Sequence, residues 1–416
     1  MPMTRRSGIS LAVLVLLGVF VALGLWLQSR EVEPGQAANS TQIDVTSDED
    51  RGPGTLREAL FIAASAEGEA TISLQAAKIT VATALPPVAN ARGIRIVAAE
   101  QGTEIDASAL TNGAVLDVAG DNVVLESVHI RNCRGAAILL RAERFQMRAT
   151  TIQSCDVGVD VAENASDVLI ERNRFVDNRV GVRFAAPSPN TIVVKNEFVT
   201  HRDAGIWAVR SDAKERGAEL AIRENRFTNE RIGILAANVP VLIERNELLD
   251  CEEAAMQLMG TGAIARGNRI SGGTGMGIIV EDARGAVIED NELDGLSAYG
   301  IMLKGAADTL VRANRIHNSG YGLAFVLGNP RSPSTAVDNT IIGAKFNGID
   351  VIGDSPILRD NKVMQPRGLA LKVVDFDPDR GQTVRSAPFL EGNNFDARGL
   401  AVASNEDGLR SGNRRR

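Results

Sequence analysis

Residues 173–182 read NRFVDNRVGV, and this pattern returns along most of the chain. In each copy an Asn is followed two residues later by an apolar side chain and, farther on, by a Gly that opens a short apolar run. The gaps between successive copies are 21 to 29 residues, and the recurrent residues are Asn173, Asn196, Asn225, Asn246, Asn268, Asn291, Asn314, Asn339 and Asn361. Self-similarity at such a period indicates a repeat architecture.

Each copy has room for two or three strands of three to five residues between Gly or Asn turns, but no room for a helix. A unit of this size cannot bury its apolar face alone, so successive copies must stack. Strands that coil and stack in parallel at about 4.8 Å per rung meet this need. We expect the recurrent Asn at a bend, in the left-handed conformation that it tolerates, with its amide bonded to the next rung's Asn.

The N-x-[FIL] turn and the G-[IV]-x-[VIL] strand resemble the repeat of the right-handed parallel β-helix proteins of the pectin-lyase-like superfamily, over about residues 70–405. The resemblance implies an all-β, single-stranded right-handed parallel β-helix of about a dozen coils. The superfamily includes lyases, hydrolases, epimerases, adhesins and non-catalytic binders, so the resemblance implies no particular chemistry.

The segment GPGTLREAL, residues 52–60, is similar to the segment that opens many exported bacterial β-helices, where it forms a short capping helix. Thr55 as N-cap and Glu58 three residues later make a capping box. Apolar residues of the same helix can then cover the first rung; they are Leu56, Ala59, Leu60 and Ala63.

Residues 9–27 form an uncharged apolar run of 19, and Arg5 and Arg6 precede it. A helix of that length can just span a bilayer, and the arginines favour an N-terminus in the cytoplasm. A cleaved signal peptide is the alternative, although its core is usually shorter and its cleavage site closer. We expect a single-pass anchor in a bacterial inner membrane, with the β-helix in the periplasm or outside the cell.

The expected organisation has four parts. Residues 1–29 form the signal anchor, 30–69 a linker and N-terminal cap, 70–405 the β-helix, and 406–416 a polar tail.

Composition narrows the class of protein. The 416 residues are 44% hydrophobic and 23% charged, with three Cys and three His. This composition excludes a disulfide scaffold, a coiled coil, a polytopic membrane protein and a disordered chain. The net charge of −7 argues against a nucleic-acid partner.

The residue after the recurrent Asn alternates in sign. The column reads Arg174, Glu197, Arg226, Glu247, Arg269, Glu292, Arg315. At rung spacing each charge lies between opposite charges, so we predict a solvated ion-pair ladder that also fixes register. A charged substrate site would need one dominant sign, so this face is not expected to bind substrate.

On the Gly-containing strands we expect an outward column between two inward residues. It reads Asp160, Arg183, Trp207, Leu235, Gln257, Ile279, Met302, Ala324, Asp350 and Ala370. Tyr299 and Tyr321 precede the Gly on neighbouring rungs, and insertions at 185–190, 210–218, 328–335 and 375–388 follow the same strands. We predict that Trp207, Tyr299 and Tyr321 bind a polysaccharide on this face. The alternative is an apolar face that loops or another protein cover.

β-Elimination or C5 epimerisation of a uronate needs a base near the C5 proton and a cation for the carboxylate. Asp160 and Arg183 fall on adjacent rungs, and His201 and Asp203 lie in the turn before Trp207. We assign these four as candidate catalytic residues. Ordinary solvated turn residues are the alternative, and no motif of a uronan epimerase or pectate lyase is present. Whether the chain is an enzyme stays open.

Arg202 lies in the same turn as His201 and Asp203. We assign it to substrate binding.

The segment DFDPDRG, residues 375–381, carries alternate carboxylates that superficially resemble a calcium loop. Pro378 interrupts it, however, and the twelfth position is Ser386 instead of Glu. A solvated acidic loop is the alternative to Ca²⁺, and no other cofactor is indicated.

The three cysteines, Cys133, Cys155 and Cys251, each fall three residues after an inward apolar residue. Cys133 and Cys155 belong to neighbouring rungs and can form a disulfide in an oxidising compartment.

The sequence therefore favours an exported, membrane-anchored β-helix that binds or modifies an acidic, uronate-containing polysaccharide, by lyase or C5-epimerase chemistry if it is an enzyme. A non-catalytic scaffold or protein-interaction module of the cell envelope is the alternative. The expected partners are a polysaccharide or an envelope protein.

Overall fold

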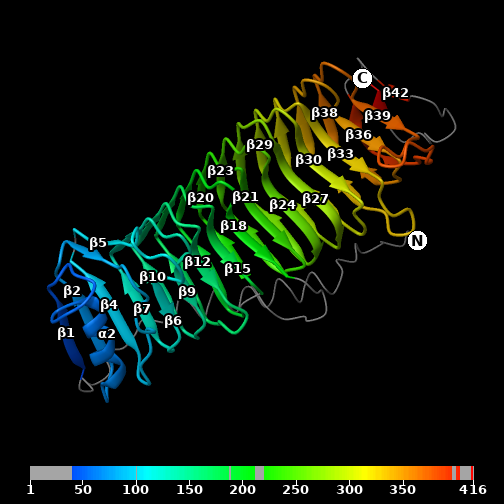
Figure 1. Ribbon diagram of the computed structural model, residues 1–416. Coiled ribbons are helices and arrows are strands. Elements are labelled where there is room, and N and C mark those ends of the chain that lie inside the picture. The colour runs from blue at the N-terminus through cyan, green and yellow to red at the C-terminus, as the bar shows by residue number, and fades with distance from the viewer. Residues whose placement is uncertain are drawn as a thin grey trace, which may run out of the picture. The chain divides into compact units, whose positions relative to one another are not determined.

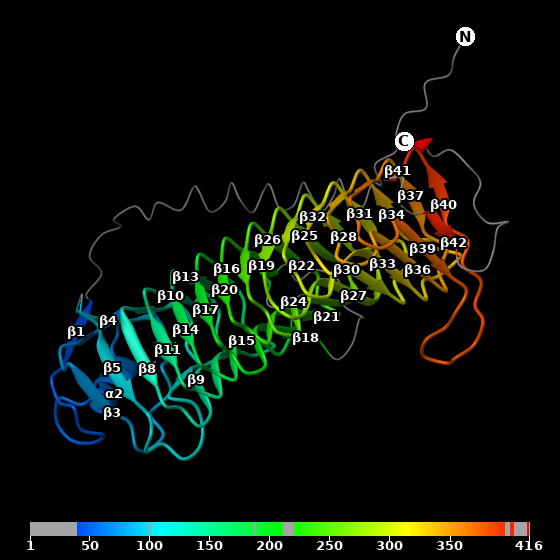
Figure 2. The same cartoon turned by 90° about the horizontal axis from the view of Figure 1, so that it is seen from above.

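The computed structural model describes residues 40–99, 101–186, 189–210, 220–395, 400–402 and 414–415. The described chain from Thr41 onward coils through three parallel sheets, and from Leu116 to Val374 each turn of the coil contributes one strand to each sheet (Figures 1 and 2). The sheets contain 15, 15 and 13 strands, and neighbouring strands pair in parallel. The predicted right-handed parallel β-helix of about a dozen coils is confirmed.

Sheet 1 comprises β1 (Thr41–Val45), β2 (Ala70–Leu74), β4 (Ile94–Ala98), β7 (Val123–Glu126), β10 (Gln146–Arg148), β13 (Leu169–Glu171), β16 (Thr191–Val194), β19 (Leu220–Arg223), β22 (Val241–Glu244), β25 (Ala263–Arg266), β28 (Val287–Glu289), β31 (Leu310–Arg312), β34 (Thr335–Val337), β37 (Ile357–Arg359) and β40 (Phe389–Glu391). Sheet 2 comprises β3 (Lys78–Thr80), β5 (Thr103–Asp106), β8 (Val128–Arg131), β11 (Thr151–Gln153), β14 (Arg174–Val176), β17 (Glu197–Val199), β20 (Arg226–Thr228), β23 (Glu247–Leu249), β26 (Arg269–Ser271), β29 (Glu292–Asp294), β32 (Arg315–His317), β35 (Thr340–Ile342), β38 (Lys362–Met364), β41 (Asn394–Phe395) and β43 (Arg414–Arg415). Sheet 3 comprises β6 (Leu116–Val118), β9 (Ala136–Leu140), β12 (Val157–Val161), β15 (Val180–Phe184), β18 (Ala204–Val209), β21 (Ile232–Ala237), β24 (Ala254–Thr261), β27 (Met276–Arg284), β30 (Tyr299–Lys304), β33 (Tyr321–Val326), β36 (Ile349–Ile352), β39 (Leu371–Val374) and β42 (Leu400–Val402).

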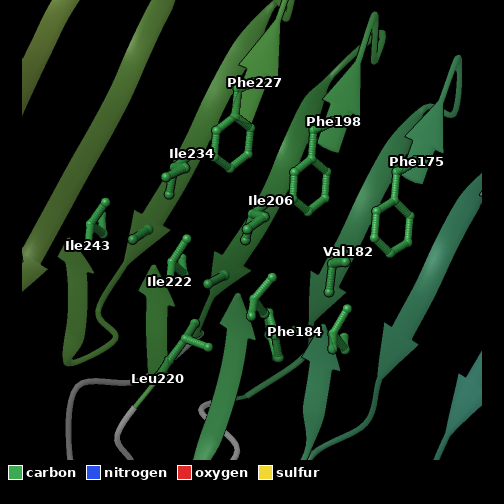
Figure 3. Close-up of a cluster of buried hydrophobic side chains, with 14 of the residues drawn as sticks. Phe175, Val182, Phe184, Phe198, Ile206, Leu220, Ile222, Phe227, Ile234 and Ile243 are labelled. Atoms are coloured by element: carbon green, nitrogen blue, oxygen red, sulfur yellow. The ribbon is translucent and has the colours of Figure 1, made fainter. Parts of the chain in front are cut away.

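The interior is filled by in-register columns of like side chains. Phe175, Phe198 and Phe227 stack with ring centroids 4.9 and 4.7 Å apart, and each pair of ring planes is within 6° of parallel. Figure 3 shows these rings facing a column of aliphatic side chains that includes Ile206 and Ile234 from sheet 3. The inward positions of the Gly-containing strands are buried, as predicted, but several outward positions, such as Ala324 and Asp350, are buried too.

The recurrent Gly has a steric cause. A Cβ on Gly181 would lie 2.5 Å from the carbonyl oxygen of Gly205 and 2.8 Å from Cδ1 of Phe198. The backbone φ of Gly181 is not positive, so packing between rungs, and not a left-handed turn, excludes a side chain here.

The predicted amide ladder is confirmed and extends one rung farther, to Asn393. Nδ2 of each Asn donates to Oδ1 of the next at 2.9 to 3.0 Å, from Asn173 to Asn393. The expected left-handed conformation of these residues is wrong. The residue before the Asn has the positive φ, as in Arg172 at 53° and Lys195 at 56°. The Asn side chain therefore points inward, where it bonds neighbouring rungs.

The predicted ion-pair ladder is confirmed in part, because two of its six neighbouring pairs form an ion pair among the described residues. Arg174 bonds Glu197 at 2.9 Å and Arg226 bonds Glu247 at 3.0 Å. All four side chains are largely exposed, so each pair stabilises the fold by no more than about 1 kcal/mol.

The capping helix forms as predicted. It is α2 (Leu56–Ser65), and its four predicted apolar residues are buried. Oγ1 of Thr55 accepts from the amide of Glu58, while the Glu58 carboxylate accepts from the amide of Gly54, one residue before the N-cap. Arg57 on this helix reaches Asp50, which also binds the hydroxyl of Thr83.

The N-terminal region differs from the prediction at residues 41–45, and the predicted membrane anchor lies outside the described residues. Thr41–Val45, expected in the linker, forms β1 and pairs in register with Ala70–Leu74. Buried and exposed side chains alternate from Gln42 to Val45. This strand pattern lets Ile43 and Val45 complete the core beside the capping helix. Residues 9–27 lie outside the described residues, and no described helix is long and apolar enough to cross a bilayer.

Candidate functional site

Sheet 3 carries most of the predicted site residues on its outer face. Register pairing confirms the column from Asp160 through Asp350, but its last member is Lys372 instead of Ala370. Ala370 is fully buried because it occupies the inward position that Gly fills on other rungs. The corrected set, Asp160, Arg183, Trp207, Leu235, Gln257, Ile279, Met302, Ala324, Asp350 and Lys372, is called the outer column below.

The candidate catalytic pair Asp160 and Arg183 meets at the N-terminal end of the outer column. Nε and Nη2 of Arg183 donate to the two carboxylate oxygens of Asp160 at 2.8 and 2.6 Å. The hydrogen bonds to Asp160 raise the pKa of Arg183 above its usual value. Both oxygens of Asp160 are occupied, so in this arrangement the carboxylate is not available as a base.

Asp203 belongs to a second charged column, in the turn that enters sheet 3. Arg179 bonds Asp203 at 2.8 Å and Asp156 at 2.6 Å, and Arg231 continues the series to Glu253 at 2.9 Å. The hydrogen bonds to Asp156 and Asp203 raise the pKa of Arg179, and the one from Arg179 lowers the pKa of Asp156. This alternation is an ion-pair ladder like that of sheet 2. Arg202 lies beside it and is exposed.

His201 is the one predicted site residue that does not reach the surface. Its side chain and that of Glu230 are both 0% exposed. The side-chain Nδ2 of Asn178 donates to Nε2 of His201 at 3.3 Å. Nδ1 of His201 therefore carries the proton and donates to the Glu230 carboxylate at 2.9 Å. Burial raises the pKa of Glu230, against the lowering effect of the hydrogen bond from His201. His201 was predicted as a catalytic residue, with a solvated turn residue as the alternative; its burial excludes the solvated alternative and keeps it from sharing a surface with Asp160.

The same inward column holds all three cysteines. Cys133 and Cys155 form a disulfide, as the rung spacing allowed. Cys251 is a buried free thiol whose pKa burial raises to about 12, so it is not a reactive nucleophile.

Trp207 lies on the outer face, as predicted, but it is half-buried. It packs with Val209 against a small apolar cluster formed by Ala204, Ile232 and Leu235, which is separate from the core of the coil. Part of the indole is therefore already covered by side chains of its own sheet.

The two tyrosines form the most complete aromatic surface on this face. Tyr299 and Tyr321 stack with ring centroids 4.4 Å apart at an angle of 22°, and Phe346 extends the stack at 4.8 Å and 26°. Phe346 is 52% exposed. Sequence reasoning missed Phe346 because it lies in a turn, two residues before Gly348 instead of one. The signal in the sequence was an aromatic residue one or two positions before the Gly in three successive coils.

Asp350 lies beside this stack and was not predicted as a site residue. It is 3% exposed, and it accepts from Nδ2 of Asn347 at 2.8 Å and from the hydroxyl of Tyr299 at 3.4 Å. Burial raises the pKa of Asp350, and burial together with the Asp350 charge raises that of Tyr299. Tyr299 thus stays protonated and donates, which makes it a poor general base.

Three cations surround the aromatic stack. Lys372 follows Asp350 in the outer column. Lys345 is adjacent to Phe346, and Arg367 lies one rung beyond it, since the Arg367 amide donates to the carbonyl of Ala344. Lys345 and Arg367 are exposed. Within the described ranges Lys345 and Arg367 form no ion pair, whereas Lys372 lies beside Asp350 and opposes the rise in pKa that burial causes there.

The predicted residues therefore form two groups instead of one. β18, which carries Trp207, and β30, which carries Tyr299, are separated by β21, β24 and β27. Four rung steps correspond to about 19 Å. One sugar ring cannot contact both groups.

The three carboxylates of the calcium-like loop have separate partners. Asp375 accepts from the amide of Ser386, Asp377 from the amides of Asp379 and Arg380, and Asp379 pairs with Lys304. In the part of the chain that the structure describes, no three His, Cys, Asp or Glu side chains gather as a metal site.

The chain matches the family described as "Right handed beta helix region" over residues 88–216 and 213–363. It belongs to this family. No protein with a curated description matches it. Among solved structures, the catalytic unit of a thermostable GH87 alpha-1,3-glucanase from Streptomyces thermodiastaticus is similar, with a TM-score of 0.54 and 15% identity over 89% of this chain and 71% of that one. A DFA-IIIase mutant from Arthrobacter chlorophenolicus has a TM-score of 0.52 and 10% identity over 84% of this chain and 98% of that one. These likenesses show the fold alone.

Proposed function

We propose that this protein is an exported, membrane-anchored β-helix that binds an acidic polysaccharide on the outer face of sheet 3. The observation that carries the proposal is the stack of Tyr299, Tyr321 and half-exposed Phe346 beside the unpaired cations Lys345 and Arg367. Aromatic rings supply a flat apolar surface for sugar rings at low entropic cost, and the cations suit uronate carboxylates.

Two further observations support parts of the proposal. By its name, the structurally similar glucanase acts on a polysaccharide. The disulfide between Cys133 and Cys155 favours an oxidising compartment, and the apolar run at 9–27 favours export with a retained anchor in the inner membrane.

Binding is favoured over turnover. The outer column contains two carboxylates, of which Asp160 is bound by Arg183 and Asp350 is buried against Tyr299. Neither is free to remove the C5 proton of a uronate in the observed arrangement. Lyase and epimerase activities are therefore tested as separate outcomes of the experiment below.

The test uses the full-length protein in detergent with oligogalacturonate, oligoalginate and a neutral glucan. Phe346→Ala should weaken binding of the acidic oligosaccharides by about 1–2 kcal/mol, as expected for one aromatic contact, without a large change in melting temperature. Phe389→Ala is the matched control, because Phe389 is 51% exposed but lies on sheet 1. It should leave affinity unchanged.

The same samples separate the chemistries. New absorbance from an unsaturated uronate would identify a lyase, and solvent exchange of the C5 proton an epimerase. If the wild-type protein binds none of the three glycans, or if Phe346→Ala binds as wild type does, the proposal is wrong.

One observation favours a second function, a protein-interaction module of the cell envelope. The apolar cluster around Trp207, Ile232 and Leu235 lies on the outer face, apart from the core. Under that function Trp207→Ala should abolish capture of an envelope protein and leave glycan binding intact. Loss of glycan binding in Trp207→Ala would instead extend the glycan site toward the N-terminal rungs.

A further inference from the structure

The insertion at 375–388 has a base that is fastened to the coil. It follows β39, and the Ser386 hydroxyl donates to the carbonyl of Val374 at 2.7 Å while accepting from the amide of Gly353 at 2.8 Å. The amide of Ser386 donates to the Asp375 carboxylate at 2.8 Å. Ser386 is 4% exposed, so these bonds are shielded from water. The two ends of the insertion are therefore held together on the last rungs of sheet 3.

The tip of the insertion turns back along the outer face. The Asp377 carboxylate accepts from the amides of Asp379 and Arg380 at 2.9 and 3.0 Å, and this turn points Asp379 at Lys304. Oδ2 of Asp379 lies 3.3 Å from Nζ of Lys304.

This contact crosses several rungs. Lys304 pairs in register with Val326, Val326 with Ile352, and Ile352 with Val374. The tip thus returns over three rungs, about 14 Å, from the strand at which the insertion begins. Val326, on the outward side of β33 between the two ends of this path, is only 8% exposed.

The contact at the tip is much weaker than the attachment at the base. The side chains of Lys304 and Asp379 are 34% and 55% exposed, and a solvated ion pair contributes little to stability. A second carboxylate, Glu281, lies 3.9 Å from Lys304. A polysaccharide carboxylate held beside Lys304 by the aromatic stack can compete with Asp379 for this exposed ion pair, whereas the buried bonds of Ser386 are shielded from such competition.

Lys304 is on the same strand as Tyr299, and Met302 of the outer column lies between them. Lys304 is thus a cation at the C-terminal end of β30, the strand whose first residue, Tyr299, is the first ring of the aromatic stack. We infer that Lys304 binds an acid group of the polysaccharide and that Asp379 occupies this position in the free protein, so that the 375–388 loop is displaced when ligand binds. The inference rests on the proposed function for the class of ligand, but the closure of the loop does not.

Three charge changes test the exchange of carboxylates, with oligogalacturonate as the probe and the full-length protein in detergent. Asp379→Asn removes the internal competitor and should tighten binding about threefold to tenfold. Lys304→Gln removes the cation and should weaken binding by a similar factor. Asp338→Asn makes the same charge change on an exposed turn between sheets 1 and 2, at a φ of 57° that Asn tolerates, and should leave affinity unchanged.

If the ion pair has only a structural role, Asp379→Asn and Lys304→Gln should change the affinity for oligogalacturonate in the same direction. That result would overturn the inference. Equal tightening in Asp379→Asn and Asp338→Asn would also overturn it, because only net charge would then matter.

Limited trypsin digestion tests closure without ligand, since Arg380 at the tip of the loop is an exposed cleavage site. Asp379→Asn and Lys304→Gln should both be cut several-fold faster than wild type after Arg380, and oligogalacturonate should accelerate this cleavage in wild type. Unchanged cleavage in both variants overturns the inference whatever the affinities are. Faster cleavage in a protein that binds no uronate supports closure and overturns the proposed function together with the assigned ligand.

Discussion

Removing one amide from the middle of the Asn ladder should damage the coil locally and severely. Asn268 is 1% exposed, and its Oδ1 accepts from the amide and from Nδ2 of Asn246 at 2.9 and 3.0 Å. Its Nδ2 donates to the carbonyl of Ile243 and to Oδ1 of Asn291, both at 2.9 Å. Asn268→Ala removes these four hydrogen bonds and a longer fifth, from Nδ2 to the carbonyl of Arg266 at 3.2 Å. It also leaves the Asn246 backbone N–H buried without an acceptor.

The expected cost follows from these contacts. A net value of about 1 kcal/mol for each of the four shorter hydrogen bonds, with about 1–3 kcal/mol more for the buried N–H left unpaired, gives a loss of about 5–7 kcal/mol. In a repeat protein this loss falls on the mutated rungs and their neighbours more than on a single global transition. The backbone amide of Asn246 should therefore exchange its hydrogen at least about ten-thousandfold faster than in wild type.

Hydrogen exchange read by mass spectrometry or NMR measures this directly, and urea denaturation gives the global change. Asn164→Ala is the control, because Asn164 is exposed and makes one side-chain bond, to the carbonyl of Arg141 at 2.9 Å. It should cost well under about 1 kcal/mol. If Asn246 stays as protected as in wild type and the Asn268→Ala denaturation midpoint matches that of the control, the ladder does not stabilise the coil as argued.

Three other perturbations have defined outcomes. Replacing Cys133 and Cys155 with Ser should lower stability by about 3 kcal/mol in denaturant titrations, because the disulfide closes a loop with a sequence separation of 22; an equal midpoint with and without reductant in wild type would contradict this. Gly181→Ala should cost about 1–3 kcal/mol, since its Cβ collides with the next rung, and a variant as stable as wild type in thermal unfolding would show that the rungs can separate. Partial burial raises the pKa of Asp50, but hydrogen bonds from Thr83, Ala82 and Arg57 outweigh it and lower that pKa from 3.8 to about 2. Because the folded-state pKa is the lower one, the stabilisation is complete above about pH 4 and about 2 kcal/mol is lost as the pH falls toward 2. Melting curves of wild type and Asp50→Asn should therefore converge toward pH 2.

The sequence allowed the coil to be predicted because its cause is local and repeated. The same residue types recur in most coils. They are an Asn whose side-chain amide bonds neighbouring rungs, an apolar residue two positions later, and a Gly where a Cβ has no room. The outward and inward alternation on sheet 3 followed from the strand period of two. The N-terminal strand was missed because Thr41–Val45 lacks the Asn and Gly signals, although Ile43 and Val45 alternate as a strand requires.

The candidate site was predicted less well, because it depends on which turn positions face inward. His201 was placed at the surface, yet it falls three residues after Phe198, as Cys155 falls three residues after Ile152. Burial of the cysteine column was a signal that His201 would be buried too. Lys304 and Asp379 come together only because the 375–388 loop turns back over three rungs, and no repeat pattern predicts the path of an insertion.

The alternating charges after the ladder asparagines constrain how a protein of this kind can change its length over evolutionary time. Duplicating or deleting one coil among Arg174, Glu197, Arg226 and Glu247 would place two arginines or two glutamates on adjacent rungs, where like charges repel. Gaining or losing two coils at once restores the alternation at both junctions. We therefore expect related proteins to gain or lose coils in pairs within this region.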